Sequence, residues 1–344
     1  MGKVIQEQFI EFHNIIRLDV NDNKEVIKKR DMLIEEIKTA IKKICEEKGI
    51  KLVRFTPFNQ GSYAMGTGNK PMYDEDDYDI DCGLLFEIDK GDYRPLQIKT
   101  WVYDALNTQF RTVEWKKACI RVQYVEEGLP KFHVDFACYA DANSDGKTYL
   151  AKGTPTSTTD NKKWEESKPT KLKDLINNKY SDVDESNQFK RAIRFMKRWK
   201  DYQFDSVNGK PTGIALTALA YNGFVPSIKD SFTRAIDIND LKATKDFVDY
   251  ILNQFSWWDS RIKVHLPVPP ENDLFEKMTD QQCKNLKTKL EKLRDTLEDA
   301  ENEADPFEAC KILRKQFGKD FPVPAKETTG QNRKLAVAGT SESA

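Results

Sequence analysis

Apolar residues in the first half of the chain change from the spacing of helices to that of strands. Over residues 7–48 they recur every three or four positions, which predicts helix. Shorter apolar or alternating stretches follow, and a period of two is typical of strands with one buried face. These strands are expected at residues 51–58, 82–88, 119–124 and 131–139. With a helix expected at 100–110 and a hairpin turn at 126–130, this part of the chain has an α+β pattern.

From residue 171 the apolar residues return to the spacing of helices. Helices are expected at residues 186–203, 213–224, 241–255 and 280–303. The polar stretch 141–170 is interpreted as a surface excursion, and the small, polar last twenty residues predict a flexible tail. We therefore expect three parts: a lobe of residues 1–170 that includes the N-terminal helices, a mainly helical lobe of residues 171–324, and a tail of residues 325–344.

The composition argues against several classes of protein. The 55 Lys and Arg residues almost balance the 56 Asp and Glu residues, so a surface for long nucleic acid is not expected. The chain contains no run of eighteen apolar residues, so no membrane span is predicted. The six cysteines form no CxxC pair and the chain has three histidines, which excludes a zinc ribbon. Scattered cysteines favour reduced thiols and a cytoplasmic location.

Six of the eight residues from 74 to 81 are acidic. A solvated acidic loop is the simplest interpretation of such a run. However, Asp79 and Asp81 alternate with Ile80 and Cys82, so on a strand the two carboxylates point to the face opposite the apolar pair. Neighbouring carboxylates repel each other unless a cation lies between them, and paired oxygen ligands suit Mg²⁺.

A third carboxylate and a Gly-Ser turn complete this pattern. Asp135 lies between two apolar residues of a later strand and would add an inward acid to a two-metal site, although an edge-strand Asp without function is the alternative. Gln60, Gly61 and Ser62 end a strand in a turn whose backbone N–H groups could hold triphosphate oxygens. A Gly-Ser turn alone indicates little, but its combination with the Asp-x-Asp pair and the later Asp is specific.

These residues resemble the polymerase-β-like nucleotidyltransferases, whose pattern is G-S, then D-x-D, then a distant D on an antiparallel strand. Within that superfamily, five segments are similar to the bacterial cGAS/DncV-like nucleotidyltransferases (CD-NTases): residues 60–63, 77–81, 133–135, 194–199 and 309–318. The resemblance covers about residues 50–322. It implies an α+β, bilobed fold with an antiparallel or mixed catalytic sheet and a mainly helical second lobe.

The resemblance also implies roles for individual residues. Asp79 and Asp81 would bind two Mg²⁺ ions, for which Mn²⁺ is an alternative. Asp135 would complete the second metal site and help to activate the attacking ribose hydroxyl. The nucleotide-binding residues would be Gln60, Gly61, Ser62, Lys197 and Thr212. The assignment of Thr212 rests on the weakest match, because Gly213 stands where the family has a small hydroxyl residue.

The helix expected at residues 186–203 is compatible with a phosphate-binding role for Lys197. At about 100° per residue, Lys197 falls just off the edge of the apolar face. Three arginines lie further round the helix, where we expect a solvated basic face: Arg191, Arg194 and Arg198.

The function implied by the resemblance is a cyclic oligonucleotide second-messenger synthase of anti-phage defence (CBASS). ATP and GTP would be joined with release of pyrophosphate, and the linear product would then be closed into a ring, with cyclic GMP-AMP as the first expectation. A separate effector would read the product. One alternative is a nucleotidyltransferase that modifies RNA or protein, and a non-enzymatic alternative is a nucleotide-binding module with a vestigial metal site.

The same resemblance bears on regulation. Without a zinc motif or a strongly basic surface, activation by nucleic acid is not expected, and the chain would act without it or under a protein partner. The tail that ends at Ala344 resembles tails that certain anti-phage operons conjugate through an E1/E2-like transferase. An untethered terminus is the alternative.

Overall fold

The computed structural model describes residues 5–18, 24–73, 78–109, 111–126, 129–204, 209–228, 237–258 and 260–326, with only the backbone of residues 78, 79, 126 and 129–131. The chain divides into two compact units. One, the sheet unit, holds residues 18–178 and 266–272. The other, the helical unit, holds the described residues within 5–17, 179–265 and 273–326. Residues 5–17 thus lie with the later helices and not with the sheet, where the sequence placed them, and the division falls at 178 rather than 170.

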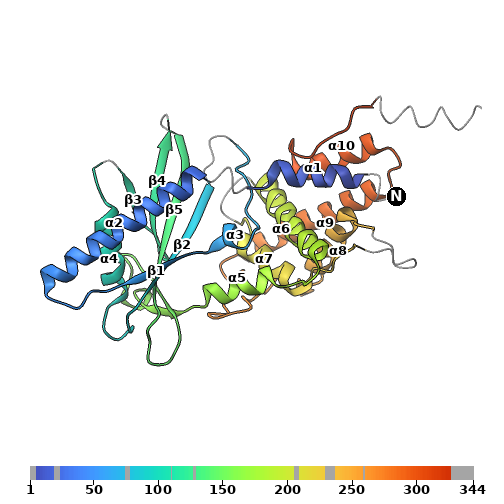
Figure 1. The fold of residues 1–344 in the computed structure, drawn as a ribbon. Helices are drawn as coiled ribbons and strands as arrows, with labels where there is room; N and C mark the ends of the chain where they lie inside the picture. Colours follow the sequence, from blue (N-terminus) through green and yellow to red (C-terminus); the bar gives the residue numbers. More distant parts are fainter. Residues whose placement is uncertain are drawn as a thin grey trace, which may run out of the picture. The chain divides into compact units, whose positions relative to one another are not determined.

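The sheet unit is built on a seven-stranded mixed sheet within the described residues (Figure 1). Its strands are β1 (Phe55–Asn59), β2 (Tyr78–Phe86), β3 (Thr112–Trp115), β4 (Ile120–Glu126), β5 (Leu129–Ala140), β6 (Tyr149–Ala151) and β7 (Trp164–Glu166). The strand order is β1-β2-β5-β4-β3, with β6 paired to β5 and β7 to β6. Only the β2–β5 pair is parallel among these pairs, so the predicted mixed α+β sheet is confirmed. The unit's helices are α2 (Lys24–Lys48), α3 (Gly61–Ala64), α4 (Pro95–Leu106) and α5 (Pro169–Asn177).

One face of this sheet forms the core of the unit. Ile80 and Cys82 of β2 and Val134 of β5 are buried against α2 and α4, which cover that face (Figure 1). Because side chains alternate along a strand, Asp79, Asp81 and Asp135 belong to the opposite face. The predicted separation of apolar and acidic residues is therefore confirmed in the strand register.

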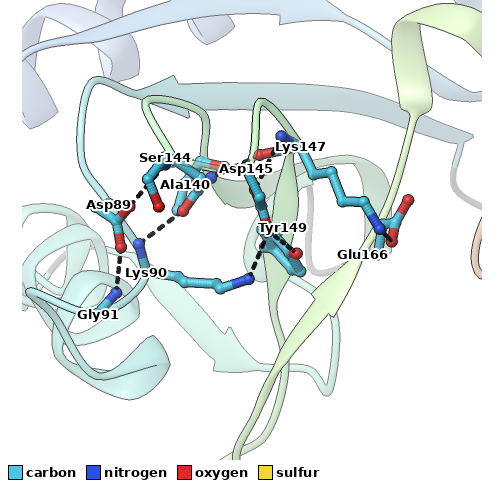
Figure 2. Close-up of polar contacts among 10 residues, drawn as sticks. Asp89, Lys90, Gly91, Ala140, Ser144, Asp145, Lys147, Tyr149 and Glu166 are labelled. Carbon is cyan, nitrogen blue, oxygen red and sulfur yellow. Dashed lines mark hydrogen bonds and ion pairs between the residues drawn. The ribbon is translucent and has the colours of Figure 1, made fainter.

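The loops that follow the C-terminal ends of β2 and β5 are joined by a polar network (Figure 2). Asp89 accepts hydrogen bonds from the backbone N–H groups of Gly91 (2.7 Å) and Ser144 (2.9 Å). Asp145 accepts hydrogen bonds from the Tyr149 hydroxyl (2.5 Å) and from the ammonium of Lys90 (3.0 Å). These hydrogen bonds lower the pKa of Asp145 to about 2. The network fixes the sheet at the end away from the acidic residues of β2.

The segment 141–170 is more than the surface excursion that its polar composition predicted. It supplies β6 and β7, and it is tied to the rest of the unit by Lys99 of α4. The buried Lys99 ammonium donates hydrogen bonds to the carbonyl oxygens of Lys116 and Gly153, each at 2.7 Å. Burial lowers the pKa of Lys99, but the carbonyl oxygens satisfy its N–H groups.

The helical unit contains six helices in its described residues, namely α1 (Gln6–Ile16), α6 (Val183–Gln203), α7 (Gly213–Gly223), α8 (Asp240–Leu252), α9 (Asp280–Asn302) and α10 (Pro306–Phe317). Four of them match the predicted helices to within a few residues. The predicted helix at 7–48 is two helices, α1 and α2, in different units. Phe9 and Phe12 attach α1 to this unit, because their rings contact Phe195 and Phe321.

Charged residues of α6 are buried in the helical unit, so the predicted solvated basic face is wrong. Arg191, Arg194 and Arg198 are 8%, 7% and 2% exposed. Asp240 at the start of α8 accepts two hydrogen bonds from Arg191, at 2.7 and 2.9 Å. Arg198 forms an ion pair with Asp320 at 3.3 Å. Acidic partners distant in sequence therefore allow Arg191 and Arg198 to be buried.

Other observations concern the whole described chain. The six cysteines all carry free thiols. Among the described residues, no helix combines the length and the apolar character needed to cross a bilayer.

We predict that Asp240→Ala lowers the free energy of unfolding of the protein by about 3–5 kcal/mol, because it leaves the buried Arg191 without its carboxylate. Chemical denaturation followed by circular dichroism measures this loss. Asp246→Ala is the matched control, since Asp246 pairs with Lys242 on an exposed stretch of the same helix. It should cost less than about 1 kcal/mol. Equal losses in the two variants would contradict the assigned role of Asp240.

We also predict an acid-dependent loss of stability that depends on His13. Burial and the neighbouring Arg194, Arg191 and Arg17 lower the pKa of His13 to about 3. Between pH 6.5 and pH 3 the unfolded chain binds a proton at His13 that the folded chain does not, so stability falls as the pH is lowered through this range. His13→Gln should remove about 2 kcal/mol of the loss between pH 7 and pH 4. Parallel curves of melting temperature against pH for both proteins would refute this.

Candidate functional site

The predicted acidic residues meet through the parallel pairing of β2 with β5. Asp79 lies opposite His133 and Asp81 lies opposite Asp135. Residues opposite each other on adjacent strands share a face, and such strands lie about 4.8 Å apart. Asp81 and Asp135 are therefore neighbours on the face opposite the one that packs against α2 and α4. The side chain of Asp79 lies outside the described part of the chain, but its backbone belongs to the same row.

The Gly-Ser turn lies directly against Asp81. The backbone N–H of Gln60 donates to the carbonyl oxygen of Asp81 at 3.1 Å, and α3 begins at the next residue. Gly61 has a φ of +68°, and a Cβ placed on it would lie 1.8 Å from Oδ2 of Asp81. Only glycine leaves room for the carboxylate there. The predicted turn is thus the start of a one-turn helix whose amide groups lie beside an acid.

Tyr139 holds the side chain of Gln60 and was not found from the sequence. Its hydroxyl donates to Oε1 of Gln60 at 2.8 Å. Burial raises the pKa of Tyr139, so the hydroxyl stays protonated and remains a donor. Because the carbonyl oxygen of the Gln60 amide is engaged, the amide nitrogen is the part left to donate to an anionic ligand. The signal was weak, because Tyr139 is simply the last aromatic residue of an alternating strand.

Arg121 is the second residue that the sequence reasoning missed. It lies opposite Asp135 in the β4–β5 pair, and its Nε and Nη2 donate to the two carboxylate oxygens, each at 2.8 Å. Alternation in β4 puts Arg121 on the face opposite the buried Ile120 and Val122. Pairing the residues on either side of the predicted hairpin turn at 126–130 places Arg121 near Asp135, so this contact could have been predicted from the sequence.

The arrangement fits a divalent cation. Asp81 and Asp135 offer carboxylate oxygens on one face, and oxygen donors are what Mg²⁺ takes in proteins. Gly61 keeps open the space beside Asp81 that a larger residue would fill. Within the described residues no group of three or more His, Cys, Asp and Glu side chains could hold a metal. The third acid of the predicted set, Asp79, is the one whose side chain is not described.

The remaining predicted nucleotide-binding residues come together in the helical unit. Lys197 of α6 is 8% exposed, and a Cβ on Gly213 would lie 3.3 Å from its Cε atom. Thr212 is the N-cap of α7, with its hydroxyl accepting a hydrogen bond from the N–H of Ala215 at 3.3 Å. An ammonium beside a helix N-terminus favours an anion such as phosphate. Ala344, the predicted conjugation site, lies outside the described residues.

Comparisons with known proteins match the part of the chain that carries the predicted acids. Residues 53–139 match the family described as "Cyclic GMP-AMP synthase DncV-like, nucleotidyltransferase domain". The match contains the Gly-Ser turn and all three predicted acids. A curated relative, the cyclic GMP-AMP synthase of Escherichia albertii, is 29% identical over 198 residues. The match spans 54% of this chain and 39% of that relative, so it covers about two fifths of the relative's length.

Solved structures show the same fold. The crystal structure of Vibrio cholerae DncV cyclic AMP-GMP synthase, described as a prokaryotic cGAS homolog, gives a TM-score of 0.70 at 20% identity, and the match covers 90% of this chain and 93% of that one. The complex of that enzyme with the linear intermediate 5′ pppA(3′,5′)pG gives 0.68 at 20% identity and the same coverage.

The chain therefore shares the fold of the Vibrio cholerae enzyme, and the predicted α+β class with a mixed sheet is confirmed. Residues 53–139 thus match the DncV-like nucleotidyltransferase domain, and the predicted resemblance to the bacterial cGAS/DncV-like nucleotidyltransferases is confirmed.

We predict that Gly61→Ala lowers the rate of pyrophosphate release from nucleoside triphosphates at least about 1,000-fold, because the added methyl group displaces the Asp81 carboxylate. Gly146→Ala is the matched control: its φ is also +68°, but nothing lies within 4 Å of the added atom. Both variants should lose about 1–2 kcal/mol of stability from backbone strain. If Gly61→Ala were as active as Gly146→Ala, the close approach to Asp81 would have no functional meaning.

Proposed function

We propose that this chain is a magnesium-dependent nucleotidyltransferase that makes a cyclic dinucleotide from nucleoside triphosphates. The observation that supports this most strongly is the placement of Asp81 opposite Asp135, with Gly61 packed against Asp81. It joins two carboxylates to a turn that can approach a phosphate closely, which is the combination that phosphoryl chemistry requires.

Each residue would have a distinct part in the transfer. Asp79, Asp81 and Asp135 would hold two Mg²⁺ ions, or Mn²⁺ in their place, and the bound ions would offset the charge that develops on the α-phosphate and on the leaving pyrophosphate. Asp135 would also orient the attacking ribose hydroxyl and take up its proton.

The nucleotide-binding residues would position the donor. Gln60, Gly61 and Ser62 would place the triphosphate beside Asp81, with the Gln60 amide oriented by Tyr139. In the helical unit, Lys197 and the N-terminus of α7 at Thr212 would bind phosphate oxygens.

The names of the relatives support a proposal for the substrates and the product. The Escherichia albertii relative is named cyclic GMP-AMP synthase, and structures of the Vibrio cholerae enzyme contain GTP or a linear adenosine–guanosine intermediate. For this chain we propose ATP and GTP as substrates and cyclic GMP-AMP as product, in a cytoplasmic anti-phage (CBASS) pathway with a separate effector. Catalysis would not require nucleic acid, and conjugation of Ala344 by an E1/E2-like transferase would be one means of control.

The test is an incubation of the purified protein with Mg²⁺ and all four nucleoside triphosphates, followed by phosphatase treatment and mass spectrometry. We expect a phosphatase-resistant cyclic dinucleotide containing adenosine and guanosine. Asp81→Ala should reduce it at least about 1,000-fold. Asp145→Asn, at the other end of the sheet, should leave it unchanged. Chelation of Mg²⁺ by EDTA should abolish it, and added Mn²⁺ should restore it.

Two outcomes would overturn the proposal. If the Asp81→Ala variant formed cyclic product at the normal rate, the acidic residues would not be needed for catalysis. Transfer of label to added RNA or protein, with no small cyclic product, would replace the synthase by a modifying nucleotidyltransferase.

A further inference from the structure

The third acid of the site already has a cationic partner. Arg121 donates from Nε to Oδ1 of Asp135 and from Nη2 to Oδ2, so the two groups meet edge to edge. The carboxyl side chain is 9% exposed and the guanidinium side chain 26% exposed. A charge-assisted pair with two parallel hydrogen bonds is both strong and geometrically defined. It therefore fixes the plane in which the Asp135 carboxylate lies.

The surroundings of this pair explain why a cation is needed there. Asp81 lies opposite Asp135 on the neighbouring strand, with Asp79 in the same row. The thiol of Cys119 also forms a hydrogen bond with Asp135, and burial, followed by the charge of Asp135, raises the pKa of that thiol. The thiol therefore stays neutral. Adjacent carboxylates at a partly buried surface repel each other, and Arg121 supplies positive charge at this point.

Arg121 and a divalent ion have opposing requirements. A carboxylate has about four lone-pair positions, two of which the guanidinium uses in its plane. The other two can face an ion, but the fixed positive charge beside them lowers the affinity for any cation. Hence the charge of Arg121 should weaken ion binding, whereas its two hydrogen bonds should orient the carboxylate for catalysis.

We propose that Arg121 is a positioning residue for Asp135 and the resident counter-cation of the acidic site, in electrostatic competition with the divalent ions. This inference rests on the proposed function, since it concerns ions and a reaction assigned there. It adds a residue that sets how much metal the protein needs and how Asp135 meets the attacking hydroxyl.

Two substitutions separate the charge from the hydrogen-bond geometry. Arg121→Gln removes the charge, and Arg121→Lys keeps the charge but cannot make the two parallel hydrogen bonds. The matched control is Arg111→Gln, because Arg111 also holds a carboxylate, that of Glu36, through both of its terminal nitrogens. That pair joins α2 to the residue before β3 and does not involve the acids of the site.

The first measurement is the affinity for Mn²⁺ alone, by titration calorimetry of the full-length protein without nucleotide. Arg121→Gln should bind Mn²⁺ about 3- to 10-fold more tightly than the wild type. Arg121→Lys and Arg111→Gln should stay within about twofold of the wild type. Unchanged or weaker binding in Arg121→Gln would overturn the role of counter-cation, as would equal tightening in Arg111→Gln.

The second measurement is steady-state kinetics at saturating Mg²⁺. Both Arg121 variants should lose about 10- to 100-fold in kcat with less than about a twofold change in KM for the triphosphates, because orientation of Asp135 matters in the transition state and not in binding. Normal kcat in Arg121→Lys would overturn the positioning role. A wild-type protein that binds Mn²⁺ and shows the predicted affinity changes, but forms no cyclic product, would contradict the proposed function and not this inference.

Discussion

The site depends on the register of one parallel strand pair. Asp81 meets Asp135 because β2 and β5 are aligned residue for residue from Tyr78 to Phe86, and the same alignment places Ile80 opposite Val134 on the buried face. A slip of one residue would exchange the two faces of a strand, which would bury a carboxylate and expose the core. The apolar contacts with α2 and α4 therefore hold the acids together, so the stability of the sheet unit and the geometry of its site have one cause.

The acidic face of the sheet is ordered by specific contacts with its neighbours. Gly61 allows the first turn of α3 to contact Asp81, and Tyr139 of β5 fixes the Gln60 side chain. Arg121 then orients Asp135 from the other side. Ordering these groups in the folded protein means that little reorganisation is needed when a charged ligand arrives, which is how fixed polar groups favour a transition state.

How much the sequence predicts differs between the two units. The alternation of Asp79, Asp81 and Asp135 with apolar residues was sufficient to place them on one face, because the strand period is fixed by backbone geometry. The roles of Tyr139 and Arg121 were not predicted, because they depend on contacts with residues from other parts of the chain. The arginines of α6 were expected in solvent, since a helical projection cannot include Asp240 or Asp320 from distant segments. The strands β6 and β7 were not predicted because each is only three residues long, which is too short to show an alternating pattern.

The measurement that tests the account most directly is a crystal structure with Mn²⁺ and a non-hydrolysable ATP analogue, with the ions located by anomalous scattering. The account predicts manganese peaks about 2.1 Å from carboxylate oxygens of Asp79 and Asp81, with Asp135 ligating one of the ions and a triphosphate oxygen beside Ser62. Manganese bound away from these acids, or a triphosphate remote from the Gly61–Ser62 turn, would contradict it.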